Sequence, residues 1–179
     1  LGLRPTAMYS GDVPGGLTSG ISPIPTPIVT WAGVAALVAL AVLLVRATIR
    51  ALRPRLDSGP WPRWQALTAS PVLVAASFAI VGYLSGWIPW VLTVSRSAVF
   101  QFYAVVLTPF SALALAVALA AWLAPSAGRS PEDLRGRRIA AGILVGAAIA
   151  AAAFFFPLWT GLPIDRWYWQ LHLWLPGWR

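Results

Sequence analysis

The segment Ile139–Trp159, with the sequence IAAGILVGAAIAAAAFFFPLW, decides the fold class because it contains no charged residue. An α-helix needs about 20 apolar residues to cross the hydrocarbon core of a bilayer, and this segment is long enough. Its many Ala and Gly residues also allow neighbouring helices to approach closely. We therefore expect Ile139–Trp159 to cross a membrane as an α-helix.

Three further segments have the same character and also contain no Lys, Arg, Asp, Glu or His. They are Ile28–Val45, Val72–Leu92 and Val99–Leu123. Each has about 18 residues or more, which is enough to span a bilayer. The sequence therefore predicts an all-α, polytopic membrane protein with four transmembrane helices. The expected organisation is an external loop region over residues 1–26 and a four-helix membrane domain over residues 27–179.

The composition excludes several classes of protein. Hydrophobic residues make up 59% of the chain and charged residues 10%, and the mean hydropathy is +0.74, which excludes a disordered chain and disfavours an ordinary soluble domain. The net charge of +8 does not indicate nucleic-acid binding, because the arginines cluster at predicted membrane edges and not on one basic stripe. The chain has no Cys and a single His, His172, so we expect no disulfide and no metal site.

Nine of the 13 basic residues, all arginine, lie in the two connections that would share one side of the membrane. Connection 46–64 carries Arg46, Arg50, Arg53, Arg55 and Arg63, and connection 126–138 carries Arg129, Arg135, Arg137 and Arg138. By the positive-inside rule these two connections face the cytoplasm. Both termini and the short turn that contains Arg96 then face the outside.

The regions outside the spans give further expectations. Gly and Pro are frequent in Leu1–Thr26, so we expect a loop there, and we interpret Leu1 as an internal position of a longer protein. Ser130-Pro131-Glu132-Asp133 predicts a helix start with Ser as the N-cap. The Trp-rich tail Thr160–Arg179 is expected to be a short amphipathic segment at the membrane surface. Within this tail, His172 is expected to be a surface residue.

Two sequence patterns are more specific than a general membrane protein requires. One is Gly86-Trp87-Ile88-Pro89-Trp90, followed by Arg96-Ser97-Ala98-Val99-Phe100-Gln101-Phe102-Tyr103-Ala104 and Pro109-Phe110. The other is the ending, from Phe156-Pro157-Leu158-Trp159-Thr160-Gly161-Leu162-Pro163 to Trp178. The chain thereby resembles, over nearly its whole length, the C-terminal four-helix region of bacterial protein O-mannosyltransferases. These are actinobacterial relatives of the dolichyl-phosphate-mannose–protein mannosyltransferases.

This resemblance implies a multi-span glycosyltransferase of the bacterial plasma membrane. Such an enzyme moves mannose from a polyprenyl-phosphate donor to Ser or Thr of secreted proteins, and the secretion channel is a candidate meeting place. The catalytic acid of the family lies in an early external loop that this chain does not contain. Asp12 and Asp165 are the acids on the predicted outer side, and neither matches that motif. We therefore expect no catalytic residue and no cofactor in this segment, which would be inactive without the N-terminal part of the enzyme.

Arg96 is the strongest candidate for contact with the donor. It lies at the outer end of two predicted spans, at headgroup depth, where a guanidinium can bind a phosphate through paired hydrogen bonds. Tyr103 lies on the same face of a helix that starts at Arg96 and is placed to reach the phosphate or sugar. Phe100 is placed to line a groove for the lipid chain. The alternatives are an arginine that snorkels to bulk lipid phosphates and a phenylalanine that only packs.

The aromatic residues near the span ends are expected to anchor the chain at the membrane interface, and contact with the isoprenoid or the acceptor peptide is the alternative. They include Trp87, Trp90, Trp167, Trp169 and Trp174.

Three other functions stay open from the residues alone. A non-catalytic membrane scaffold subunit would explain the missing acids equally well. Another lipid-linked sugar transferase, such as an arabinosyltransferase, would share the membrane plan. A transporter fragment is less favoured, because the spans lack charged residues and no internal repeat stands out.

Overall fold

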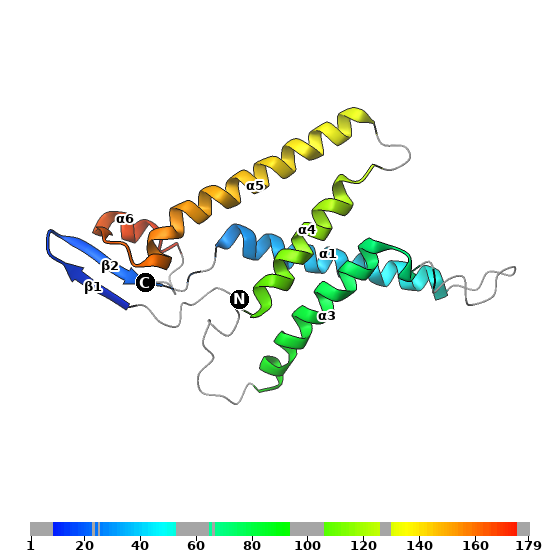
Figure 1. Cartoon of the computed structure of the whole chain (residues 1–179), viewed down its shortest axis with the longest axis horizontal. Helices are drawn as coiled ribbons and strands as arrows, with labels where there is room; N and C mark the ends of the chain where they lie inside the picture. The colour runs from blue at the N-terminus through cyan, green and yellow to red at the C-terminus, as the bar shows by residue number, and fades with distance from the viewer. Residues whose placement is uncertain are drawn as a thin grey trace, which may run out of the picture. The chain divides into compact units, whose positions relative to one another are not determined.

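The computed structural model describes residues 9–22, 24, 26–52, 65, 67–93, 106–125 and 130–174. In these ranges the chain is mainly helical, with a small antiparallel sheet (Figure 1). The helices are α1 (Pro27–Leu52), α3 (Pro71–Leu92), α4 (Thr108–Leu123), α5 (Pro131–Thr160) and α6 (Arg166–Leu171), and the strands are β1 (Tyr9–Val13), β2 (Leu17–Ile21) and β3 (Ile164–Asp165).

The described elements form two compact units. The helical unit contains α1 from Trp31 onward, α3, α4 and the start of α5 up to Ala141. The sheet unit contains the three strands, α6 and the rest of α5 from Gly142 onward.

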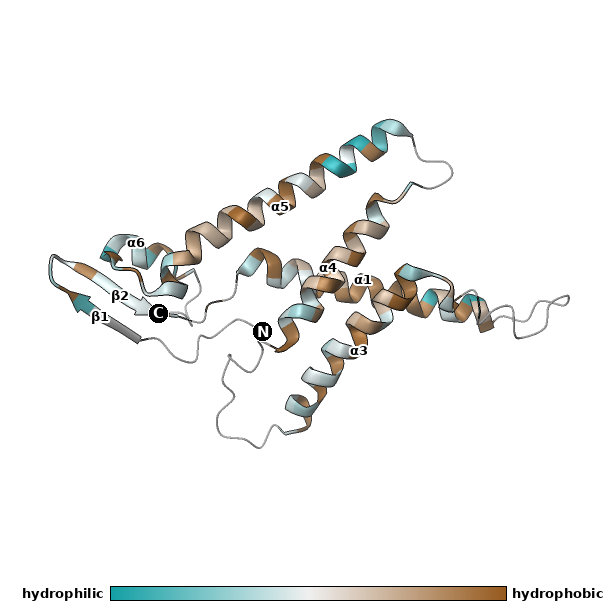
Figure 2. Cartoon of the chain, in the orientation of Figure 1, coloured by the Kyte–Doolittle hydropathy of each residue, from teal (hydrophilic) through white to brown (hydrophobic). Residues whose placement is uncertain are grey.

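The predicted fold class is confirmed, because α1, α3 and α5 are long and apolar enough to cross a membrane. Helix α4 is shorter, with 16 residues, and residues 94–105 before it lie outside the described part. Figure 2 shows apolar residues along most of α4 and the middle of α5, with hydrophilic residues at the start of α5. Large apolar side chains such as Val38, Phe78 and Ile149 are exposed, as expected for surfaces that meet lipid or other membrane segments.

Proline begins three of these helices, at Pro27, Pro71 and Pro131. It suits the first helical turn, because its fixed φ is helical and its missing N–H would have no partner there. The hydroxyl of Ser130 accepts a hydrogen bond from the Asp133 N–H at 3.1 Å. The helix start predicted at this position is therefore confirmed.

Two helices extend beyond their apolar spans and contain arginines that were expected in loops. Helix α1 continues to Leu52 and includes Arg46 and Arg50, whereas α5 starts at Pro131 and includes Arg135, Arg137 and Arg138. Arginine has a high helix propensity, and its long side chain reaches polar surroundings from a helix that has left the hydrocarbon core. The expectation of loops was therefore wrong for these five residues.

Small residues allow close packing inside the helical unit. Its buried core consists of Ala36, Leu37 and Leu40 of α1, Ala76 and Ala79 of α3, and Ala114 of α4. A Cβ atom on Gly33 would collide with Ser111, and one on Gly82 would collide with the ring of Phe110. Glycine at these two positions therefore permits the approach of α1 and α3 to α4.

The N-terminal region contains a β-hairpin, so the loop expected over residues 1–26 is corrected. Strands β1 and β2 pair antiparallel, with Val13 opposite Leu17. Gly15 and Gly16 in the turn have φ values of 98° and 78°, which glycine adopts without steric cost. The glycines and Pro14 thus mark the turn of a hairpin and not a structureless stretch.

Strand β3 joins the tail of the chain to this hairpin. It pairs antiparallel with β2, with Asp165 opposite Leu17 and Ile164 opposite Thr18. Residues far apart in the sequence therefore form one sheet. Among its described residues, the expected amphipathic tail segment contains strand β3 and the short helix α6 over Arg166–Leu171.

Candidate functional site

The three residues predicted to contact the donor, Arg96, Phe100 and Tyr103, lie outside the described residues. Their role therefore stays a prediction. The structure does describe the helix ends on either side of them, at the C-terminus of α3 and the N-terminus of α4.

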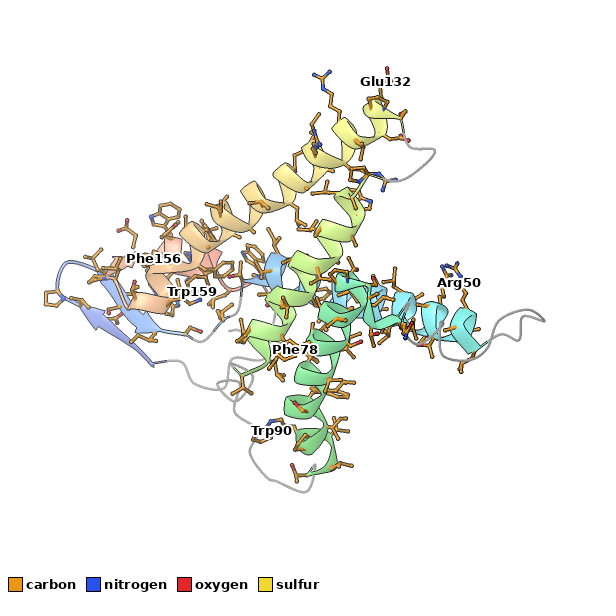
Figure 3. All side chains as sticks on the ribbon, turned by 45° about the vertical axis from the view of Figure 1, so that its right-hand side comes forward. Arg50, Phe78, Trp90, Glu132, Phe156 and Trp159 are labelled. Atoms are coloured by element: carbon orange, nitrogen blue, oxygen red, sulfur yellow. The ribbon has the colours of Figure 1, made fainter. Side chains whose placement is uncertain are left out.

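The end of α3 is closed by a local cap. Thr93 donates to the Pro89 carbonyl oxygen twice, from its backbone N–H at 3.1 Å and from its hydroxyl at 2.8 Å. Trp90 is half-buried beside this end, and Figure 3 shows its side chain near the end of α3. Trp87, one turn earlier, is 38% exposed. The last two turns of α3 therefore contain one exposed and one half-buried indole ring, and the anchoring role expected of Trp87 and Trp90 stays a prediction.

The start of α4 packs against α3 close to this cap. Leu107, directly before α4, is buried, and a Cβ atom on Gly86 would lie 2.7 Å from its Cδ2 atom. Gly86 belongs to the last two turns of α3. Leu107 therefore packs against the last two turns of α3, whereas the connection that carries Arg96 lies outside the described residues.

The sheet unit contains a cluster of aromatic rings around His172. The imidazole ring stacks on Phe154, with the centroids 4.0 Å apart and an interplanar angle of 21°. Tyr168 meets it edge-on at 4.7 Å and Phe155 at 5.5 Å. Helices α5 and α6 supply these rings, so the cluster joins the end of the apolar helix to the tail.

His172 is fully buried, so the expectation of a surface residue was wrong. Its Nδ1 atom lies 2.7 Å from the Tyr168 carbonyl oxygen, and its Nε2 atom lies 2.7 Å from the Phe154 carbonyl oxygen. A carbonyl oxygen only accepts hydrogen bonds, and a neutral imidazole has one N–H, so the neutral ring donates to one of these two oxygens. Tyr168 lies four residues before His172, so the spacing of one helical turn could have indicated this contact. Phe154 lies 18 residues before His172, and nothing in the local sequence indicates that the two residues meet.

Hydrogen bonds also join the hairpin region to the end of α5. The backbone N–H of Ser22 donates to Leu158 at 2.9 Å, and the Ser19 hydroxyl donates to the Gly161 carbonyl at 2.7 Å. The indole N–H of Trp159 donates to the Ile24 carbonyl at 2.7 Å, and Figure 3 shows Trp159 near the end of α5. The buried core of this unit consists of Ile24, Phe155, Leu158 and Trp169.

The described tryptophans of the tail divide into two groups. Trp169 is 7% exposed and belongs to the core, so it is not placed at an interface as expected. Trp167 and Trp174 are exposed, and the anchoring role predicted for them stays a prediction. Phe156, on the last turns of α5, is also exposed (Figure 3). Several aromatic side chains of this unit are therefore available for contact with lipid or another chain.

The two acids of the sheet unit lie on strands that do not pair with each other. Asp12 in β1 and Asp165 in β3 are both exposed, and β2 lies between their strands. Two strand spacings separate such positions by roughly 9–10 Å. In the part of the chain that is described, no group of three His, Asp or Glu residues is placed to hold a metal ion.

Residues 18–178 match the family described as the C-terminal four-transmembrane region of protein O-mannosyltransferase. The chain belongs to this family. The resemblance inferred from the Trp-Ile-Pro-Trp and Phe-Pro-Leu-Trp patterns is thereby confirmed.

Two curated relatives carry the name polyprenol-phosphate-mannose–protein mannosyltransferase. The protein from Mycolicibacterium smegmatis is 34% identical over 119 residues, which is 66% of this chain and 22% of the relative. The protein from Mycobacterium tuberculosis is 34% identical over 100 residues, which is 56% of this chain and 19% of the relative. The chain thus spans about a fifth of the length of these relatives. No solved structure matches it.

Proposed function

We propose that this segment is the C-terminal membrane region of an enzyme that transfers mannose from a polyprenyl-phosphate donor to Ser or Thr of secreted proteins. The observation that carries the proposal is the family match over residues 18–178. The names of the mycobacterial relatives support the donor and the protein acceptor. The N-terminal part of the enzyme supplies the catalytic acid, so the segment is inactive alone.

The role of the segment is to hold the lipid-linked donor. Arg96 binds the donor phosphate, Tyr103 contacts the phosphate or sugar, and Phe100 lines the path of the polyprenyl chain. Support comes from the packing of Leu107 beside Gly86, which brings together the two described helix ends that flank these residues. A guanidinium at that depth matches the geometry of a phosphate.

The protein lies in the bacterial plasma membrane with its arginine-rich ends in the cytoplasm. The end of α1, with Arg46 and Arg50, and the start of α5, with its three arginines, then share the inner side. The sheet unit and the Arg96 connection lie outside, where acceptor proteins emerge. The asymmetric distribution of arginine supports this orientation.

The test is an assay of the full-length protein in membranes with polyprenyl-phosphate-mannose and a Ser/Thr peptide. We expect mannose transfer, and we expect Arg96→Ala to lower kcat/KM for the donor by about tenfold or more through lost charged hydrogen bonds. Arg166→Ala, an exposed arginine at the start of α6, serves as the matched control and should leave the kinetics unchanged. Normal membrane levels of both variants show that insertion is intact.

Each alternative predicts a different result in this assay. Transfer of a different sugar, with no use of the mannose donor, would move the chain to another class of lipid-linked sugar transferase. A protein that transfers no sugar would favour the scaffold subunit. Normal donor kinetics in Arg96→Ala would overturn the phosphate-binding role but not the enzyme class.

A further inference from the structure

A groove between α1 and the start of α3 combines an apolar wall with two arginines. Its volume is about 460 Å³, which is within the range of about 300–1,000 Å³ that ligand sites occupy. Val42, Leu43 and Leu73 form part of the apolar wall, and Arg46 and Arg50 lie along the same groove. The described residues that line the groove include these two positive charges and no acidic side chain.

Helix geometry places the two charges together. Arg46 and Arg50 are four residues apart on α1 and therefore share one face of the helix. Both are exposed, and Figure 3 shows the Arg50 side chain extending from α1 near its end. Two guanidinium groups on one face of a helix can both donate charge-assisted hydrogen bonds to a single phosphate.

The start of α3 adds a polar group on the opposite wall. Ser70 lines the groove, and its Oγ atom accepts a hydrogen bond from the Leu73 N–H at 3.4 Å. The hydroxyl proton is then available to an oxygen of a bound anion. The N-terminus of this helix also carries a partial positive charge.

Along α1 the residues that line the groove are apolar from Ala39 to Leu43. The two arginines follow, at Arg46 and Arg50. The apolar span of α1 ends at the first arginine, so this change coincides with the transition from hydrocarbon to headgroups. We infer that this groove binds one anionic glycerophospholipid, with an acyl chain on the apolar wall and the phosphate between Arg46, Arg50 and Ser70. This inference is independent of the donor site at Arg96 and of the sugar that the enzyme transfers.

The test measures which lipid stays bound to the full-length protein. The protein is reconstituted in phosphatidylcholine vesicles with a minor fraction of phosphatidylglycerol, extracted mildly, and analysed by native mass spectrometry. We expect wild type to retain phosphatidylglycerol preferentially, and R46Q/R50Q to reduce this retention on the order of tenfold or more, given the attraction of each arginine to anionic lipid. The matched control is R135Q/R138Q, which removes the same charge from exposed arginines of α5 that do not line the groove.

A second variant tests whether the shape of the groove, and not only its charge, is needed for lipid binding. It also provides a test if R46Q/R50Q does not accumulate in the membrane. Ala39→Phe fills the apolar wall and keeps both arginines, so we expect it to lose phosphatidylglycerol as well. Ala150→Phe, at an exposed position of α5, should retain it. Equal losses in R46Q/R50Q and R135Q/R138Q, or unchanged retention in Ala39→Phe, would overturn the inference. Displacement of the lipid by inorganic phosphate alone would also overturn it, because the acyl chain would then contribute nothing.

Discussion

Single polar groups make the most specific contacts of the sheet unit, and His172 is the clearest case. Its ring lies among Phe154, Phe155 and Tyr168, and both of its nitrogens contact carbonyl oxygens. A buried polar ring is tolerated only when its nitrogens have partners, since an unsatisfied group loses its hydration without compensation. His172 thus joins the C-terminal tail to the end of α5 through direction-dependent bonds.

Replacement of His172 should destabilise the sheet unit. We expect His172→Ala to cost about 2–4 kcal/mol, because it leaves a cavity among the rings and removes the hydrogen bonding of the imidazole to the backbone carbonyl oxygens. His172→Phe keeps an aromatic ring, so it should recover the stability that comes from packing but not the stability that comes from hydrogen bonding. The measurement is thermal unfolding in detergent together with limited proteolysis of the tail. Gln170→Ala, at an exposed position of α6, is the control, and equal stability of Gln170→Ala and His172→Ala would contradict the assigned role.

At the scale of helices, the association of α3 with α4 depends on the absence of side chains at particular positions. Gly82 faces the ring of Phe110, and Gly86 faces Leu107. Phe110 also contacts Phe78 of α3, with centroids 5.9 Å apart. In a membrane, where lipid tails are as apolar as the side chains, such close packing supplies much of the force that associates helices.

Gly82→Ala should weaken this helix pair. Its Cβ atom would overlap the Phe110 ring, and overpacking of this kind costs typically about 1–3 kcal/mol. Thermal unfolding of the full-length protein in detergent gives the measurement. Gly136→Ala has open space around its added Cβ atom and should be neutral or stabilising, because alanine favours helices. A second change, Phe110→Leu, should restore stability to Gly82→Ala, and failure to do so would contradict the proposed overlap.

Helices α4 and α5 are joined near their polar ends by an arginine. Arg137 of α5 donates from Nη1 to the Trp122 carbonyl oxygen at 3.1 Å, and its Cζ atom lies 5.6 Å from the centre of the Trp122 ring. Carbonyl groups in the last turn of a helix have no partner within that helix. One arginine of this connection therefore caps a helix end, in addition to any role in orienting the chain.

At the scale of the whole molecule, arginine is distributed unevenly along the described helices. Most of the described arginines lie toward the end of α1 or the start of α5, whereas the sheet and the aromatic cluster belong to the same unit as the end of α5 and the first residues of α1. The proposed orientation puts the sheet unit outside, on the side of the acceptor protein.

Cysteine labelling tests this orientation, since the chain has no native cysteine. Asp12→Cys in β1 and Glu132→Cys in α5 replace exposed residues at the two ends. With any cysteines elsewhere in the full-length protein replaced, we expect a membrane-impermeant maleimide to label Asp12→Cys in spheroplasts and Glu132→Cys only after permeabilisation. Equal labelling of both in permeabilised cells is the control. The reverse pattern would invert the topology and place Arg96 in the inner leaflet.

The sequence by itself determined the helical membrane character, the helix start at Ser130 and the family. These properties depend on local information, because each apolar segment responds to the bilayer separately and each cap uses residues within one turn. The motifs around Trp87 and Trp159 carried the family resemblance for the same reason. The candidate donor site rests on that resemblance and on the position of Arg96, and it remains a prediction.

Only the tertiary structure decided the hairpin with its third strand, the burial of His172 and Trp169, and the groove beside Arg46. Each of these depends on partners distant in the sequence, such as Gly161 for Ser19 or Phe154 for His172. Glycine and proline in the first 26 residues favour turns, and turns occur both in loops and in hairpins. The pairing of β2 with β3, which is distant in the sequence, shows that this region is part of a sheet. Composition determines which segments enter the membrane. The hydrogen-bond partners of buried polar groups, in contrast, are brought together only when the chain folds.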